Sequence, residues 1–139
     1  MILLDTNVVS EAMRLNPDQH VINWIDAQPL ETLYLSSISV AELRAGVALL
    51  PPGKRRAALQ GGLEREILPL FTGRVLSFDL PCTHQYAELL AKARKLGRAL
   101  GTADALVAAV AGANAFSVAT RDVLPFRGVG LNVINPWEG

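Results

Sequence analysis

The chain has 139 residues, of which 50% are hydrophobic, and its 13 basic residues balance 13 acidic ones. This length and composition predict one globular domain over residues 1–139 and exclude an intrinsically disordered chain. A single cysteine, Cys82, excludes an internal disulfide. The longest apolar run, residues 105–111, is too short to span a bilayer, and the N-terminus lacks the basic start of a signal peptide. We therefore expect a cytoplasmic protein that makes no contact with membranes.

Short apolar runs alternate with segments of helical spacing along the whole chain. Strands are expected at residues 1–4, 32–35, 75–78, 116–119 and 131–134. Helices are expected at residues 8–13, between Pro17 and Pro29, and at residues 40–50, 54–68, 79–96 and 102–113. Continuous apolar strands that alternate with helices favour a parallel sheet covered on both faces. The predicted fold class is α/β, a three-layer α/β/α domain around a central, mostly parallel sheet of about five short strands.

Four acidic residues are expected at one edge of this sheet. Asp5 directly follows the first strand, and Asp122 follows the fourth after two residues. Glu42 lies in the first turn of the helix after the second strand, and Asp104 lies in the first turn of an apolar helix. The functional crevice of an open α/β sheet lies at the carboxyl ends of its strands. The pattern therefore predicts that all four carboxylates converge there.

Each acid, taken alone, also has a purely structural interpretation. Asp5 is placed to cap the first helix, and Ser39-Val-Ala-Glu42 has the spacing of a capping box. Asp104 suits the positive end of a helix that begins at Thr102, and Asp122 is an ordinary turn residue. Joint convergence argues against four separate caps. Buried carboxylates without partners are costly and tend to hold a cation.

Clustered carboxylates without histidine or cysteine are hard oxygen ligands. They suit Mg²⁺ or Mn²⁺ better than zinc or copper. A metal held in this way orients a water molecule, lowers its pKa and stabilises the charge that develops at a phosphodiester during hydrolysis. Thr6, Asn7 and Thr120 are candidates for positioning that water or the scissile phosphate through hydrogen bonds.

Five segments in order then match a known family. They are Met1-Ile-Leu-Leu-Asp5-Thr-Asn, Ser39-Val-Ala-Glu42-Leu-Arg44, Ala103-Asp104-Ala-Leu, Ala119-Thr120-Arg121-Asp122 and Asn135-Pro136-Trp137. Together they resemble the PIN-domain ribonucleases, in particular the VapC toxins of bacterial toxin–antitoxin pairs and, within them, the FitB branch. The resemblance implies a Mg²⁺-dependent endoribonuclease, active with Mn²⁺ as well. It also implies a homodimer silenced by a small antitoxin that binds operator DNA.

The resemblance also assigns the site residue by residue. Asp5, Glu42, Asp104 and Asp122 would hold the metal and act in catalysis, with the hydroxyl of Thr120 beside them. Two positions depart from the family pattern. Pro125 stands where many relatives have a further aspartate, which leaves Asp122 as the single acid of its segment, and Gly101-Thr102 stands where many relatives have a proline.

Binding of an RNA substrate would require contacts to phosphates. The expected RNA-binding residues are Arg44, Arg121 and Asn7, whereas the basic runs at residues 54–56 and 92–98 are also typical of solvated helix faces. The two tryptophans, Trp24 and Trp137, are expected to pack in the core.

Two other functions remain open at this point. A phosphatase with an aspartate nucleophile commonly carries a second aspartate at the position of Asn7 and a late lysine, and no lysine follows Lys95. A catalytically weak module that acts on operator DNA through its antitoxin would bind metal without cleaving RNA.

Overall fold

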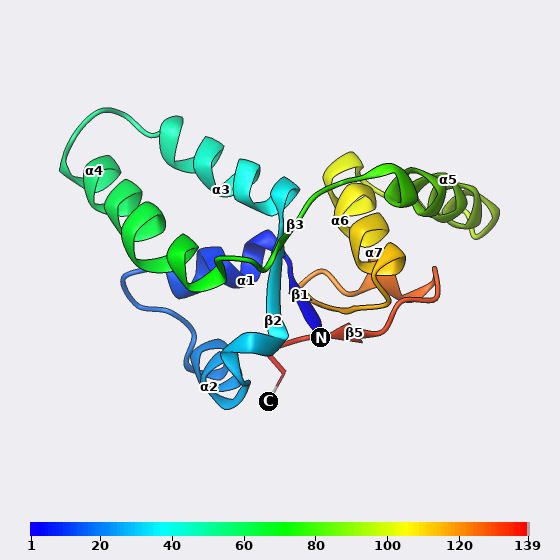
Figure 1. Cartoon of the computed structure of the whole chain (residues 1–139), viewed down its shortest axis with the longest axis horizontal. Helices are drawn as coiled ribbons and strands as arrows, with labels where there is room; N and C mark the ends of the chain where they lie inside the picture. The colour runs from blue at the N-terminus through cyan, green and yellow to red at the C-terminus, as the bar shows by residue number, and fades with distance from the viewer. Residues whose placement is uncertain (139) are drawn as a thin grey trace.

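The computed structural model describes residues 1–138 and contains a single sheet flanked by helices (Figure 1). The strands are β1 (Ile2–Leu4), β2 (Leu33–Ser36), β3 (Val75–Leu76), β4 (Ser117–Ala119) and β5 (Val133–Ile134). The α-helices are α1 (Thr6–Ala12), α2 (Gln19–Ala27), α3 (Ser37–Ala48), α4 (Lys54–Gly61), α5 (Leu80–Lys95), α6 (Thr102–Ala113) and α7 (Leu124–Arg127). Two 3-10 helices, η1 (Leu30–Thr32) and η3 (Leu68–Phe71), and a π-helical segment, η2 (Gly62–Ile67), complete the elements. No helix within residues 1–138 is long and apolar enough to cross a membrane.

The five strands form one parallel sheet in the order β3-β2-β1-β4-β5. The first strand of the chain is therefore the central one, with Leu3 paired to Tyr34 on one side and to Val118 on the other. Chain order reverses at β1, where β2 lies to one side and β4 to the other. Such a switch point is where open α/β sheets open a crevice at the carboxyl ends of their strands. The predicted parallel α/β sheet of five strands is confirmed.

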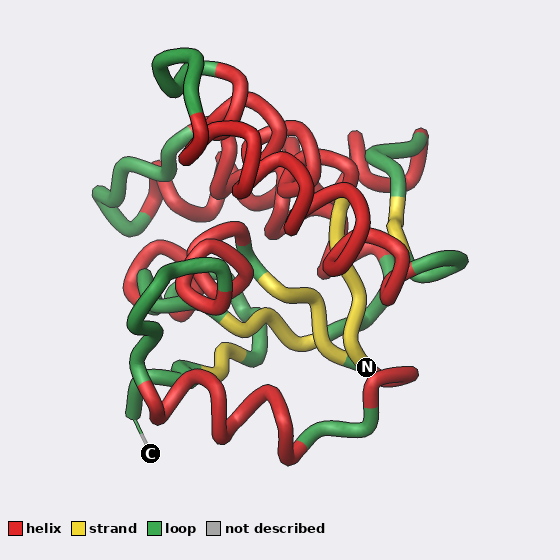
Figure 2. The backbone as a smooth tube through the Cα atoms, turned by 90° about the vertical axis from the view of Figure 1, so that its left-hand side faces the viewer, coloured by secondary structure: helices red, strands yellow, loops and turns green. Residues whose placement is uncertain are grey.

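Alternate side chains of each strand face two separate cores. Leu3 and Val118 pack in the core beneath α5, α6 and α7, whereas Leu4 and Ala119 pack in the core beneath α1 to α4. This alternation is the two-residue period of a strand, and both faces are apolar because helices cover both. Figure 1 shows the strands between these two groups of helices, and Figure 2 shows the strands, in yellow, from the side on which α4 lies in Figure 1. The short α6 helix is buried along most of its length, which explains its run of small apolar residues.

The helix starts differ from the sequence-based expectations. The first helix begins at Thr6 with Asp5 as its N-cap, two residues before the expected start. Ser36 caps α3 by accepting a hydrogen bond from the Ser39 N–H, so the expected capping box from Ser39 to Glu42 is not formed. Gly101, not Thr102, is the N-cap of α6. The helices α1 and α3 thus absorb residues that the local pattern assigned to the preceding loop, whereas α6 begins at Thr102 as expected and differs only in its cap.

Two other expectations need correction. The segment expected as one helix over residues 54–68 is divided into α4, the π-helical η2 and the 3-10 helix η3, and Pro69 within η3 cannot donate the backbone hydrogen bond that an α-helix needs. The short helix α7 was not expected. Its four residues carry Pro125 and are too few to show a helical period.

Candidate active site

A cleft of about 430 Å³ lies at the carboxyl ends of the central strands. The residues that line it come from the segments after β1, β4 and β5, from α1 and the turn after it, from α3 and from the first turn of α6, which lie far apart in the sequence. Glu42 lies in the second turn of α3 and not in the first as expected, because the helix begins at Ser37. Its lining residues are Asp5, Thr6, Asn7, Ser10, Glu11, Arg14, Glu42, Asp104, Arg121, Asp122 and Trp137. All four acids predicted from the sequence therefore meet in one cleft, at the predicted edge of the sheet.

Asp5 is the most buried of the four, with 5% of its surface exposed. Its Oδ1 accepts a hydrogen bond from the Thr6 N–H at 2.8 Å, which starts α1, and its Oδ2 accepts one from the Thr120 hydroxyl at 2.9 Å. Burial, together with the negative charges of Asp104 and Glu42, raises the pKa of Asp5 to about 6, and the two hydrogen bonds partly oppose this rise. Asp5 thus caps a helix, and its ionised form is also destabilised by burial and by the neighbouring acids. The structural and functional interpretations of this residue are therefore compatible.

Thr120 organises the polar side of the cleft from a fully buried position. Its Oγ1 accepts hydrogen bonds from the side-chain amide of Asn7 at 3.2 Å and from the Asp122 N–H at 3.1 Å. A hydroxyl has two acceptor sites and one hydrogen. Because both acceptor sites are filled, the hydrogen of Thr120 points to Asp5. Thr120 therefore fixes which carboxylate oxygen of Asp5 is held and which main-chain turn carries Asp122.

Glu42 and Asp104 complete the acidic wall. Glu42 accepts a hydrogen bond of 2.6 Å from the Thr6 hydroxyl, which ties the first turn of α1 to α3. Asp104 makes no side-chain hydrogen bond among residues 1–138, and burial together with the charges of Asp122 and Glu42 raises its pKa. Several negative charges thus face one another in the cleft without full compensation. Such a site stabilises a cation.

The two predicted RNA-binding arginines lie in different places. Arg121 lines the cleft, and its N–H donates to Oδ1 of Asn7 at 3.3 Å. Arg44 lies outside the cleft lining, where its guanidinium makes two hydrogen bonds to Glu64, at 2.7 and 3.1 Å. Residues two apart on a helix point in directions that differ by roughly 200°. Because Glu42 faces the cleft, Arg44 on the same helix faces away from it.

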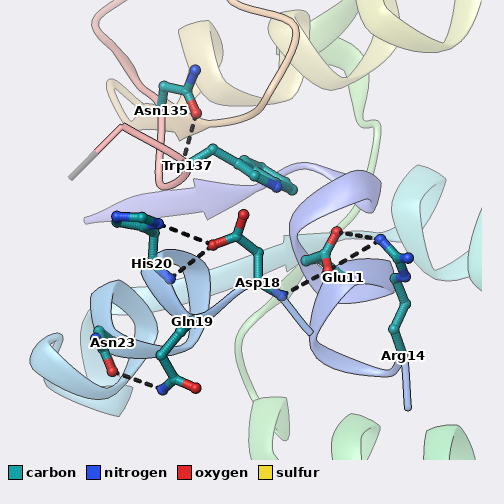
Figure 3. Close-up of polar contacts among 8 residues, drawn as sticks. All are labelled: Glu11, Arg14, Asp18, Gln19, His20, Asn23, Asn135 and Trp137. Carbon is teal, nitrogen blue, oxygen red and sulfur yellow. Dashed lines mark hydrogen bonds and ion pairs between the residues drawn. The ribbon is translucent and has the colours of Figure 1, made fainter. Parts of the chain in front are cut away.

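Four lining residues were not selected from the sequence: Ser10, Glu11, Arg14 and Trp137. Glu11 follows Asn7 by four positions on α1, so helical spacing alone places the two on one face. Its buried carboxylate accepts hydrogen bonds from the Asp18 N–H at 3.0 Å and from Arg14, as Figure 3 shows. The Asp18 N–H and Arg14 lower the pKa of Glu11. Trp137 packs partly against the core, as predicted, but it also lines the cleft.

The donor set of the cleft fits a hard divalent cation. Its acidic lining residues supply only carboxylate oxygens, and the lining within residues 1–138 contains neither histidine nor cysteine, the ligands that zinc prefers. In the described part of the chain, no three His, Cys, Asp or Glu side chains are grouped closely enough to enclose one ion. Mg²⁺ does not need such an enclosure, because it keeps several waters and takes one or two carboxylates. An open acidic cleft therefore suits Mg²⁺ or Mn²⁺ better than a metal held in a closed cage.

Comparison with known proteins gives consistent results. Residues 2–129 match the PIN domain family model. The chain is 65% identical over 138 residues to the plasmid stability protein StbB of Pseudomonas syringae pv. tomato, and 56% identical to the VapC ribonuclease Y4jK of Sinorhizobium fredii. It is 48% identical to the toxin FitB of Neisseria gonorrhoeae. Each of these alignments covers 99% of both chains.

A solved structure shares the fold in detail. The structure of FitAB bound to an IR36 DNA fragment superposes with a TM-score of 0.96 at 46% sequence identity. The match covers 100% of this chain and 97% of that chain. The acidic cleft is thus part of a fold that the two proteins share from end to end.

Proposed function

Because the chain belongs to the PIN-domain family, we propose that it is a metal-dependent endoribonuclease that acts as the toxin of a type II toxin–antitoxin pair. Its substrate would be RNA, and its cofactor would be Mg²⁺, for which Mn²⁺ would substitute. Relatives named as a VapC ribonuclease and as a toxin, each aligned over nearly the whole chain, support this proposal.

One observation carries the enzymatic part of the proposal. Four carboxylates from four separate segments converge on one cleft, and the pKa of Asp5 there rises to about 6 through burial and the charges of its neighbours. A fold gains nothing in stability from gathering like charges in a partly buried cleft. A cation that neutralises them accounts for the arrangement, and perturbed carboxylates in a cleft are a common mark of a catalytic site.

The residues of the cleft then have distinct roles. Asp5, Glu42, Asp104 and Asp122 would hold the metal, which when bound supplies an activated water and neutralises charge on the phosphate. Thr120 fixes the orientation of Asp5 and the turn that carries Asp122. Asn7 and Arg121 would contact the phosphate of the RNA. Arg44 has no part in this proposal, because its guanidinium is paired with Glu64 outside the cleft.

The toxin role implies protein partners. A FitAB structure bound to DNA shares the fold of this chain. We propose by analogy that a small DNA-binding antitoxin silences this chain and that the chain forms a homodimer. Copurification of the chain with the product of an adjacent small gene would test the first statement, and sedimentation of the free chain would test the second.

Asp104→Asn is the sharpest test of the nuclease. Asp104 makes no side-chain hydrogen bond in residues 1–138, so this substitution removes a charge and leaves the hydrogen bonds of the cleft intact. The purified chain, free of antitoxin, should cleave mixed single-stranded RNA with Mn²⁺ and not with EDTA, and Asp104→Asn should not cleave it. Asp26→Asn, an exposed charge on α2, is the matched control and should cleave as wild type does. Equal cleavage by Asp104→Asn and wild type would refute the assigned site.

A further inference from the structure

The C-terminal segment contributes one aromatic side chain to the cleft. The guanidinium of Arg121 lies over the indole of Trp137, with its central carbon 5.3 Å from the ring centre. Both residues line the cleft. A guanidinium over an indole face is an energetically favourable pair, and this contact uses none of the guanidinium N–H groups as hydrogen-bond donors to a carboxylate or phosphate. This contact joins the segment after β4 to the segment after β5.

Both partners of this pair are held by their main chains. The Trp137 N–H donates to Oδ1 of Asn135 at 2.9 Å, and Pro136 between them is buried. The Arg121 N–H donates to Asn7 at the start of α1. Figure 3 shows the Trp137 side chain extending from the C-terminal segment toward α1, which carries Glu11. The indole also packs against the core beneath α1 to α4, so it is a fixed surface for the guanidinium.

The charges of the cleft make Arg121 distinctive. The lining residues include five acids and only two cations, Arg14 and Arg121. Arg14 is paired with Glu11, whereas Arg121 makes no ion pair among residues 1–138. An RNA phosphate that enters so acidic a cleft needs a cation of the protein to contact, whether or not a metal is bound. Arg121 is the cleft cation that is left for this task in the described part of the chain.

We propose that Trp137 is a positioning residue for the substrate: its indole holds the Arg121 guanidinium in place so that the guanidinium N–H groups bind a phosphate of single-stranded RNA beside the acids. This inference rests on the proposed function and assigns a role to a residue outside the acidic set. A planar guanidinium binds a phosphate through two parallel hydrogen bonds. A partner that fixes its plane beforehand lowers the entropy lost on binding. Trp137 thus acts on the RNA through Arg121.

A double-mutant cycle tests the coupling of the two residues. Binding of a fluorescent single-stranded RNA is measured by anisotropy at low salt in EDTA, where the proposed hydrolysis does not proceed. Arg121→Gln should weaken binding about tenfold, as expected for the loss of a charge-assisted hydrogen bond. Trp137→Leu should weaken it about two- to fivefold, the range of one cation–π contact, and Trp137→Phe should recover most of that loss. In the Arg121→Gln background, Trp137→Leu should have no further effect.

The control and the contradicting results follow from the same cycle. Trp24 on α2 packs against the same core, so Trp24→Leu should leave RNA binding unchanged while melting curves report the cost to the fold. Equal loss from Trp137→Leu with and without Arg121, or no loss at all, would overturn the proposal, as would a wild-type chain that does not bind RNA.

The double-mutant cycle measures RNA binding alone, so its result does not depend on the result of the cleavage test. With Mg²⁺ and an active enzyme, Trp137→Leu should raise KM and spare kcat. A drop confined to kcat would also overturn the assignment.

Discussion

Two buried carboxylates on the same helix differ in what surrounds them. Asp5, at the start of α1, faces Asp104 and Glu42, and its pKa rises to about 6. Glu11, near the other end of α1, accepts the Asp18 N–H and pairs with Arg14, and its pKa falls below the usual value. Both residues are 5% exposed and both line the cleft. Burial alone therefore does not distinguish these two acids, whereas the direction of the pKa shift does.

This contrast assigns the two ends of the cleft different tasks. The Glu11 end is electrostatically satisfied by groups of the protein itself, and it fastens the end of α1 to the start of α2. At the Asp5 end, none of the four acids forms an ion pair among residues 1–138, and the proposed cation would balance their charge at neutral pH. Uncompensated repulsion between carboxylates is typical of sites where a bound ligand completes the charge balance.

The largest expected effect separates the two carboxylates by activity. Asp5→Asn should lower RNA cleavage by roughly 100- to 1,000-fold, the range seen when one electrostatic contributor to a transition state is removed. Glu11→Gln should leave cleavage within about threefold of wild type, because the proposed metal site does not include Glu11. Initial rates on one RNA with Mn²⁺ measure both. A loss of similar size in Glu11→Gln would end the distinction and extend the catalytic set along α1.

Asp5 and Glu11 also show how much of the site the sequence alone could predict. Apolar runs and the rule that parallel strands end at one edge were enough to predict the sheet and to place Asp5 and Asp104 together, since both inferences need only chain order and strand direction. Glu11 was missed although its spacing from Asn7 was visible, because its role depends on Asp18 in the next turn of the chain. Tertiary contacts decide such roles.

Arg44 and Trp137 illustrate the limits in opposite ways. The sequence places Arg44 near the site because it lies two residues after Glu42, but the turn of the helix points it to Glu64, twenty residues away. The sequence places Trp137 in the core, and its additional place in the cleft follows from how β5 ends beside β4. Sequence neighbours are separated by helix rotation, and distant residues are joined by strand pairing. The strand pairing is not encoded in a local pattern, whereas the rotation that separates Arg44 from Glu42 follows from the helical spacing.

The pH dependence of stability should sharpen the contrast, because the pKa shifts of Asp5 and Glu11 have opposite signs. The folded state of metal-free protein holds a proton on Asp5 between pH 3.8 and about 6, where the unfolded state has lost it. The stability from this group is therefore fully present below pH 3.8 and is lost as pH rises to about 6, by about 3 kcal/mol in total. The pKa of Glu11 is lowered, so Glu11 stabilises the folded state at pH values above the usual pKa of a glutamate. This contribution is lost as pH falls.

Urea unfolding in EDTA at several pH values measures this difference. The unfolding free energy of wild type minus that of Asp5→Asn should decrease from pH 4 to pH 6 and then level off. The same difference for Glu11→Gln should increase over the acidic range. If both free-energy differences change in the same direction with pH, the contrast between the two ends of the cleft is contradicted.

A divalent cation should act on the Asp5 end and not on the Glu11 end. Mg²⁺ at a hundred times its dissociation constant should stabilise wild type by about 2.7 kcal/mol, which raises Tm by roughly 8 °C for a chain of this size. Asp104→Asn should lose most of this shift, and Glu11→Gln should keep it. Differential scanning fluorimetry measures Tm with MgCl₂ and with NaCl of equal ionic strength. The difference between the two Tm values is the part of the shift that is specific to Mg²⁺. A wild-type Tm indifferent to Mg²⁺ would argue against a metal site among these acids.

The smallest expected effect concerns the satisfied end. Glu11→Ala leaves the Asp18 N–H and Arg14 without their acceptor and should lower the unfolding free energy by about 2 kcal/mol, as expected for a buried hydrogen bond to a charged group. Glu11→Gln should cost less, because an amide oxygen still accepts the Asp18 N–H, and Arg14→Ala should also cost less, since Arg14 is 66% exposed. Glu31→Ala, an exposed acid in η1, is the control and should stay within about 0.5 kcal/mol of wild type. If Arg14→Ala costs as much as Glu11→Ala, the ion pair and not the Asp18 N–H fastens α1 to α2, and the Glu11 end depends on charge as much as the Asp5 end does.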